Sequence, residues 1–216
     1  MDRSDVMEIE FGILGRDELM ESVELATRAY MTYEYFTNFF PDPKERYKVL
    51  MSMQYRAGLT NFGKTHFLTA KVDGKMVAFA QIDDPQYKRP SVLQFVLHGW
   101  LLVYLGVKIK HVNDWLAMDT LASKPCHDYQ HAGSDIWYTS SVTVEPEYQR
   151  KGIGSKFIAF WEDYIRERGG KELTLFTNSE KNLAFYRKNG LEIFDERDIL
   201  LPDGNKMRSW SVKKTL

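Results

Sequence analysis

Residues 144–157 read V-E-P-E-Y-Q-R-K-G-I-G-S-K-F, and this stretch decides the fold. A β-branched run ends at its Glu-Pro pair, a basic turn with two glycines follows, and an amphipathic run begins, which predicts a strand, a tight loop and a helix. The first-turn amides of a helix have no intrahelical partner, and the helix dipole favours an anion beside them. Gly152 and Gly154 let a ligand approach the backbone closely. Arg150 and Lys151 add positive charge, so the loop suits a pyrophosphate.

The spacing of the glycines separates this loop from two other phosphate-binding patterns. A P-loop needs G-x-x-x-x-G-K-[ST], and a dinucleotide fingerprint needs G-x-G-x-x-G after a strand. Here the pattern is Gln149-x-x-Gly152-x-Gly154, with a single G-x-G. That element alone also fits an ordinary strand-to-helix turn.

A second informative segment reads N-L-A-F-Y-R-K-N-G-L over residues 182–191. Asn182 is predicted to cap a helix whose apolar face carries Leu183 and Tyr186, and Gly190 stands where a left-handed C-cap belongs. Taken by itself, this helix also fits a role in which its tyrosine only packs against the sheet.

Together the two segments resemble the GNAT superfamily of acyl-CoA-dependent N-acyltransferases, whose loop [QR]-x-x-G-x-[GA] binds the coenzyme A pyrophosphate. The second segment is similar to that family's N-x-x-x-[FY]-Y-x-x-x-G-F element, with Leu191 replacing the usual aromatic residue. Trp137-Tyr138, which follows a long helical stretch, is similar to the puromycin N-acetyltransferase-like branch, although Ile136 replaces the histidine of its H-W-Y-L strand. The resemblance is sharp over residues 137–194 and weak over the first sixty.

The rest of the chain predicts an element order that agrees with this resemblance. Asp17 can cap a first helix that ends near Tyr30, Pro43 can open a second helix with Tyr47 facing inward, and Asp73-Gly74 is a strong hairpin turn. The other predicted elements are strands at 6–14, 136–144, 173–177, 193–200 and 207–212, the last two joined by a turn at Pro202, and helices at about 91–105 and 112–121. We therefore expect an α/β fold in which helices flank a mixed, mostly antiparallel central sheet. We also expect one N-acetyltransferase domain over residues 1–216, with a helical insertion at about 85–135 before the central strand.

The resemblance implies acetyl-CoA as co-substrate and direct attack of an amine on the thioester. It implies that the strand before the loop separates from its neighbour, so that the main chain of Val142, Thr143 and Val144 holds the pantetheine arm. Asn182 would bind the pantetheine or acetyl end, and Tyr186 would protonate the leaving thiolate. The residues implied at the pyrophosphate are Gln149, Arg150, Lys151, Gly152, Ile153, Gly154 and Ser155.

The base that deprotonates the amine stays open at this point. Many relatives place a glutamate where this chain has Tyr138, and a water relay through Tyr138 is one prediction. Glu145 is another candidate, but it equally fits a solvated charge at a strand end because Pro146 follows it. Further alternatives are Glu34, His131 and Asp135.

Three residues after the first predicted helix are candidates for the amine pocket. They are Tyr30, Tyr33 and Glu34. The tyrosines could enclose a cation by cation–π contact, or they could serve the core.

Composition excludes several other classes of protein. Lys+Arg 29 against Asp+Glu 30 leaves a net charge of −1, which argues against a general nucleic-acid binder. Cys126 is the single cysteine, and the five histidines have no convincing zinc-ligand spacing, so we expect no metal. The N-terminus is charged and has no apolar signal run, so a cytoplasmic protein is expected. The apolar stretch at 92–107 is too short to span a bilayer, which favours a buried or interface helix and makes a homodimer plausible.

Three functions are consistent with these observations. The favoured one is transfer of an acetyl group from acetyl-CoA to a primary amine of a small molecule. A protein or peptide N-acetyltransferase is the first alternative, and it would need an open groove. The second is a non-catalytic acyl-CoA-binding module, against which Tyr186 counts.

Overall fold

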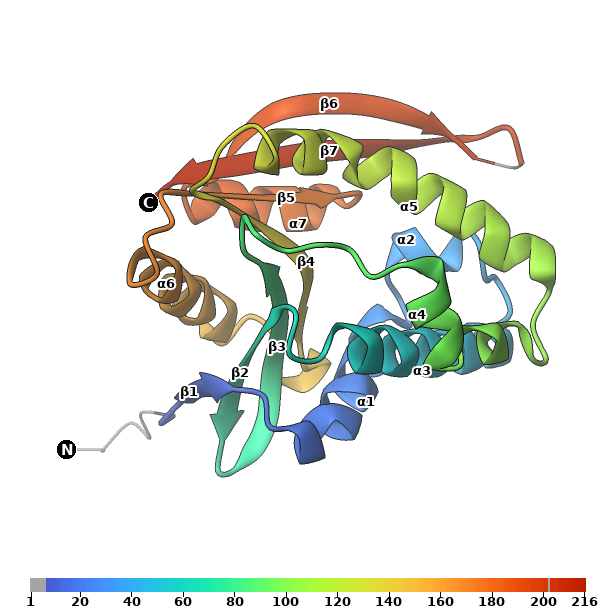
Figure 1. Cartoon of the computed structure of the whole chain (residues 1–216), viewed down its shortest axis with the longest axis horizontal. Helices are drawn as coiled ribbons and strands as arrows, with labels where there is room; N and C mark the ends of the chain where they lie inside the picture. Colours follow the sequence, from blue (N-terminus) through green and yellow to red (C-terminus); the bar gives the residue numbers. More distant parts are fainter. Residues whose placement is uncertain (1–6, 202) are drawn as a thin grey trace.

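The computed structural model describes residues 7–201 and 203–216. The N-terminal residues behind the cytoplasmic expectation, the predicted strand start at Val6 and the predicted turn residue Pro202 lie outside these ranges. Seven strands form one sheet in the order β1-β2-β3-β4-β5-β7-β6 (Figure 1). Every neighbouring pair is antiparallel except β4 and β5, so the expected mixed, mostly antiparallel sheet is confirmed. The strands are β1 (Glu10–Ile13), β2 (His66–Val72), β3 (Lys75–Asp83), β4 (Ile136–Val144), β5 (Glu172–Thr177), β6 (Glu192–Leu200) and β7 (Lys206–Thr215).

Helices cover both faces of the sheet (Figure 1). One face packs against α6, whose buried Phe157 and Trp161 share a core with Tyr186 of α7. The other face packs against α1, α3 and α5. The helices are α1 (Leu19–Tyr30), α2 (Glu34–Thr37), α3 (Pro43–Asn61), α4 (Val92–Leu97), α5 (Ile109–Gln130), α6 (Ile153–Arg166) and α7 (Glu180–Lys188).

Local signals explain the first half of the fold. Asp73 and Gly74 both have positive φ, 51° and 74°, as a two-residue hairpin turn with the right-handed strand twist requires. Pro43 opens α3, and the Asp42 side chain caps it by accepting from an amide at 2.8 Å. Two expectations are wrong. A short 3-10 turn at Arg16–Glu18, capped by the Glu18 carboxylate, precedes α1, so Asp17 lies inside this turn and does not cap α1. Tyr47 of α3 faces solvent and not the core.

The insertion between β3 and β4 differs from its prediction in two ways. The expected helix at 91–105 is broken at Gly99, which has φ 81°, into α4 and a 3-10 segment at Trp100–Tyr104. α5 is longer than expected and continues through Pro125 to Gln130.

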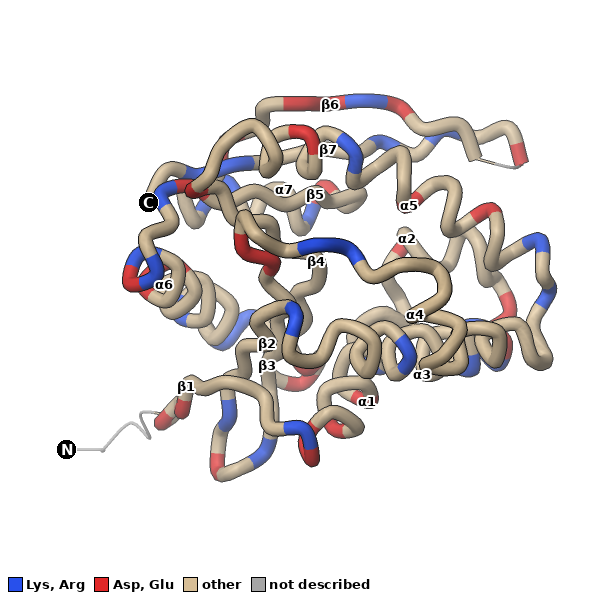
Figure 2. The backbone as a smooth tube through the Cα atoms, in the orientation of Figure 1, with Lys and Arg blue, Asp and Glu red and all other residues tan. Residues whose placement is uncertain are grey.

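The apolar stretch of the insertion was expected to be a buried or an interface helix, and the structure contradicts the first of these alternatives. Val92, Leu97 and Leu105 are 80%, 75% and 67% exposed. Figure 2 shows α4 and the segment after it without charged residues, whereas basic and acidic residues are interspersed over most other elements. One side of this segment is therefore apolar and uncovered, while its other side, as described below, faces a cavity.

Candidate functional site

The strands β4 and β5 are paired over only part of their length. Their parallel ladder runs from Ile136 opposite Glu172 to Tyr138 opposite Thr174 and then stops. Beyond this point β4 pairs only with β3, and β5 pairs only with β7. A bulge at Ser140, where the register with β3 shifts, accompanies the separation. The second half of β4 therefore has an open edge toward β5.

Two carbonyl groups of β4 face this open edge. The oxygen of Val142 accepts a hydrogen bond from the Tyr30 hydroxyl at 3.4 Å, and the same hydroxyl lies 2.9 Å from Oγ of Ser141. The oxygen of Val144 accepts from Nε2 of Gln149 at 3.1 Å. Thr143, between them, is buried, and its hydroxyl contacts a β3 carbonyl. Polar side chains thus hold main-chain groups that a bound ligand could also use.

The loop after β4 presents a row of free amides. None of the six N–H groups from Arg150 to Ser155 donates a hydrogen bond within the described part of the chain. Arg150 and Gly152 have φ of 62° and 83°, so the backbone curls on itself before α6 begins at Ile153. The side chains of Arg150 and Lys151 are exposed beside this turn. Such a nest of donors at a helix N-terminus binds phosphate groups well.

The two glycines of the loop have different roles. A Cβ on Gly152 would meet nothing within 4 Å, so its role is the left-handed backbone conformation. A Cβ on Gly154 would lie 3.0 Å from Cζ of Phe185. The second glycine therefore lets α6 approach the Phe185 ring of α7 closely.

Of the two alternatives for Glu145, a base or a solvated charge at a strand end, the structure contradicts the solvated charge. Its side chain is 5% exposed and accepts three hydrogen bonds from Arg28 of α1, the shortest 2.7 Å. This partner raises the pKa of Arg28, and the pair fixes the end of α1 against the end of β4. A carboxylate held in this way is poorly placed to take a proton from an amine.

Tyr186 and Asn182 of α7 stand beside the separated strands. Ser179 precedes the helix in the N-cap position, and Asn182 lies in its first turn, so the predicted cap is corrected by three residues. Burial raises the pKa of Tyr186, whose nearest titratable neighbours include Tyr33 and Tyr30. The phenol therefore stays protonated at neutral pH. Gly190, with φ 86°, ends the helix as predicted.

The Tyr33 hydroxyl completes the contacts across the gap. It accepts a hydrogen bond from the amide of Asn178 at 3.2 Å and lies 3.4 Å from Oγ1 of Thr177. Tyr30 therefore contacts β4 while Tyr33 contacts the end of β5, and their rings lie 6.0 Å apart.

One cavity of about 620 Å³ joins these groups. Its wall includes the open edge of β4, and Tyr30, Tyr33, Asn182 and Tyr186 line it together with Tyr138. Other parts of the wall come from α2, α3, α4, α5, the 3-10 segment after α4, the end of β3 with the loop that follows it, and β5. The structure therefore brings most of the predicted catalytic and substrate residues into one space.

Three of the predicted residues lie elsewhere. Glu34 is exposed and does not line the cavity. His131 is exposed as well, and Asp135 forms an ion pair with Lys171 at 3.1 Å.

The match to a family model decides the identity of the fold. Residues 29–191 match the acetyltransferase (GNAT) family. The chain belongs to this family. The expected relationship and the enzyme class, an acyl-CoA-dependent N-acetyltransferase, are thereby confirmed.

Solved GNAT structures share the fold at low sequence identity. The ribosomal-protein-S18-alanine N-acetyltransferase from Escherichia coli is 15% identical with a TM-score of 0.56, covering 96% of this chain and 94% of that one. The PaiA N-acetyltransferase from Thermoplasma acidophilum, in complex with coenzyme A, is 15% identical with a TM-score of 0.57, covering 97% and 100%. An agmatine N-acetyltransferase mutant in its apo form is 14% identical with a TM-score of 0.61, covering 96% and 99%.

Three ionisable groups in the cavity were not predicted from the sequence. Asp119 and His127 of α5 and Asp83 at the end of β3 line it. Burial raises the pKa of Asp83 to about 6 and also raises that of Asp119. Burial lowers the pKa of His127 to about 4, so its ring, 4.5 Å from that of Tyr138, is neutral at pH 7. The spacing of Asp119, Ser123 and His127 could have predicted part of this polar wall, because residues four apart share one face of a helix.

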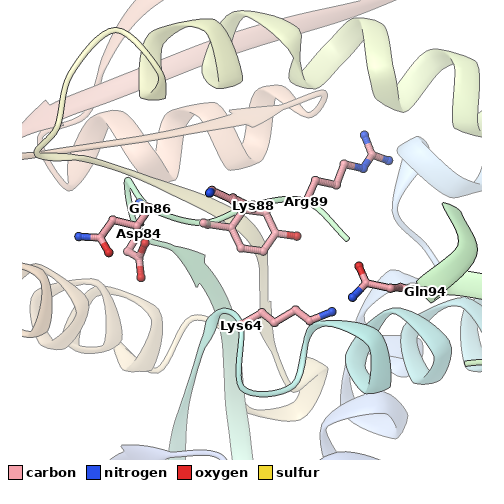
Figure 3. A pocket seen from close by; sticks show the side chains of 7 residues that line it. Lys64, Asp84, Gln86, Lys88, Arg89 and Gln94 are labelled. Carbon is pink, nitrogen blue, oxygen red and sulfur yellow. Dashed lines mark hydrogen bonds between the residues drawn. The ribbon is translucent and has the colours of Figure 1, made fainter. Parts of the chain in front are cut away.

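A smaller hollow of about 380 Å³ adjoins the cavity at the connection between β3 and α4 (Figure 3). Tyr87 and Arg89 line both spaces. Its other lining residues are Lys64, Asp84, Gln86, Lys88 and Gln94.

Two further findings concern metals and membranes. Within residues 7–201 and 203–216, no group of three or more His, Cys, Asp or Glu side chains is placed to hold a metal ion. No helix in these ranges has the length and apolarity to cross a bilayer.

Proposed function

We propose that this GNAT protein transfers the acetyl group of acetyl-CoA to a primary amine of a small molecule. One observation carries the proposal: a single cavity connects the open edge of β4 and Tyr186 with a chamber that the helical insertion covers. A coenzyme arm along β4 would deliver its thioester at one end of this cavity. A small acceptor would reach it from the other end.

The loop at residues 150–155 supplies what the coenzyme needs. Its six free amides and the two exposed basic side chains suit the pyrophosphate. The related PaiA enzyme was solved with coenzyme A, which supports a coenzyme of this type here. The carbonyls of Val142 and Val144 then offer the pantetheine amides a place along the open edge.

Acetyl transfer then requires two proton movements. The amine nitrogen attacks the thioester carbon, a C–N bond forms, and the C–S bond breaks. Tyr186, kept protonated by burial, donates a proton to the leaving thiolate. The amine loses its proton to water, and Tyr138, a neutral phenol because burial raises its pKa far above neutrality, relays that proton to solvent. Solvent returns a proton to the Tyr186 phenolate, so the enzyme ends the cycle unchanged. No covalent enzyme intermediate is involved.

Tyr30 and Tyr33 belong to the acceptor side of this proposal. Both line the cavity and stand between β4, β5 and the chamber beyond. Glu34 contributes nothing to the cavity wall, so we assign it no contact with the acceptor there.

A covered chamber favours a small molecule over a protein chain as acceptor. The similar structures include one enzyme named for a ribosomal protein and one named for agmatine, so the fold itself does not select the acceptor. In this chain, α4 and the 3-10 segment after it form part of the chamber wall, which supports an acceptor small enough to fit within it.

The test is a panel of amines with acetyl-CoA, followed by release of free thiol. Tyr186→Phe should lower kcat by roughly 100-fold or more while the coenzyme still binds, because only the proton donor is lost. Tyr47→Phe is a matched control, because this tyrosine is exposed on α3 and does not line the cavity. A non-catalytic binding module would show coenzyme binding with no thiol release for any amine. A Tyr186→Phe rate equal to the wild-type rate would remove this residue from the mechanism.

A further inference from the structure

One wall of the cavity carries a polar stripe on α5. Asp119, Ser123 and His127 follow each other at four-residue intervals and all line the cavity. Asp119 accepts a hydrogen bond from the hydroxyl of Tyr35, and no other protein group within the described residues forms an ion pair with it. Its second oxygen is therefore available toward the cavity.

Two buried polar groups beside this stripe also have no partner. Nε1 of Trp115 and Oγ1 of Thr139 belong to side chains that are 9% and 4% exposed, and neither makes a hydrogen bond within the described residues. Both residues line the same cavity. Buried polar atoms usually have a hydrogen-bond partner, so these two groups offer hydrogen-bonding capacity to a ligand or a water in the cavity.

The charges around the stripe leave the chamber negative. Asp119 and Asp83 contribute carboxylates, and the imidazole of His127 is uncharged at neutral pH. Arg89 of the loop between β3 and α4 also lines the cavity and opposes them with one positive charge that acts on Asp119, so the two carboxylates and this guanidinium leave one net negative charge (Figure 3). An ammonium group in the chamber would therefore be attracted to Asp119.

A row of aromatic side chains separates Asp119 from Tyr186, where acetyl transfer is proposed to occur. Tyr186 lies near Tyr33, the rings of Tyr33 and Tyr35 stack at 5.7 Å, and Tyr35 donates to Asp119. Two aromatic side chains thus stand between the thiolate donor and Asp119. The faces of these rings are also favourable to a cation or to an alkyl chain.

We propose that the acceptor is an amine with a second positive charge, and that Asp119 holds the distal ammonium while the other amino group reaches the open edge of β4. This inference rests on the proposed function, because it names the substrate class of the same site. Asp119 binds the substrate in this scheme and moves no proton. A monoamine of equal length has the reacting group but lacks the group that Asp119 binds.

The experiment compares unbranched diamines of about three to six carbons with the monoamines of the same length. In the wild-type protein, the best diamine should exceed its monoamine in kcat/KM by roughly tenfold or more, the usual effect of one charge-assisted contact. Asp119→Asn keeps the shape and an acceptor for Tyr35 but removes the charge. It should abolish the preference by lowering kcat/KM for the diamine, mainly through KM, and leave the monoamine within about twofold.

Controls separate this inference from folding and from the proposed function. Asp128→Asn removes a carboxylate from an exposed position on the same helix, where it pairs with Lys124, and should leave the preference intact. Diamine binding to the coenzyme-loaded protein, measured by calorimetry, gives a result without turnover, and the melting temperature of each variant reports its folding.

Each outcome has a defined meaning. If diamines bind through Asp119 but no amine is acetylated, the proposed function fails and the inference stands. If the wild type shows no preference for diamines in binding or turnover, the inference is overturned. An equal loss for diamine and monoamine in Asp119→Asn would overturn it too, because the carboxylate would then serve the reacting amine or the fold.

Discussion

Replacing Gly152 by Asp or by Asn tests whether the free amides of the loop bind the coenzyme pyrophosphate. The two side chains have nearly the same shape, both tolerate the left-handed backbone at φ 83°, and nothing lies within 4 Å of the added Cβ. They differ in one negative charge. A carboxylate about 6 Å from a diphosphate with about two negative charges costs about 0.7 kcal/mol per charge in water. The total of about 1.4 kcal/mol corresponds to about tenfold in the dissociation constant.

Calorimetry with coenzyme A at low salt measures this difference directly. We expect Gly152→Asp to bind about tenfold more weakly than Gly152→Asn, and we expect salt of about 1 M, where the Debye length is about 3 Å, to remove most of the difference. Acetyl-pantetheine has no diphosphate and should not distinguish the two variants. Equal affinity of both variants for coenzyme A at low salt would show that the diphosphate does not lie at this loop.

Three further changes test other parts of the structure. Gly154→Ala should cost about 1–2 kcal/mol of unfolding free energy because its methyl group meets the ring of Phe185, and Phe185→Leu in the same chain should recover part of it; an unchanged melting temperature would contradict the close contact. Arg28→Met leaves the buried carboxylate of Glu145 without its partner and should cost roughly 2 kcal/mol, and adding Glu145→Gln should restore stability in a double-mutant cycle. The pKa of Asp83 is raised from 3.8 to about 6, so the folded state binds this proton more tightly than the unfolded state. The free energy of unfolding therefore falls as the pH rises from about 4 to about 6, by on the order of 3 kcal/mol from this group. Denaturant titrations of Asp83→Asn over the same range should lack this pH dependence.

Short-range patterns predicted the parts of the fold that neighbouring residues determine. The hairpin at Asp73-Gly74, the strand at 136–144 and the glycine loop after it depend on backbone conformations that only a few residue types favour, so their positions could be read from the sequence. The loop residues are also adjacent in the chain, which made the predicted pyrophosphate site recognisable.

Long-range contacts account for what the sequence did not reveal. The local sequence leaves Glu145 open between a base and a solvated charge, because its partner Arg28 lies 117 residues away along the chain. The acidic wall of the cavity was missed for the same reason, since Asp83 and Asp119 meet only when the insertion folds back over the sheet. The break at Gly99 left one side of an apolar segment in solvent, which hydrophobicity alone cannot distinguish from burial.

The short ladder between β4 and β5 has a mechanical consequence. Three residue pairs join the half of the sheet that contains β1–β4 to the half that contains β5–β7. Past those pairs, side chains such as Tyr30 and Tyr33 set the width of the gap. A molecule that enters the gap beyond these pairs therefore displaces contacts of the two phenols and breaks no main-chain hydrogen bond between the two strands.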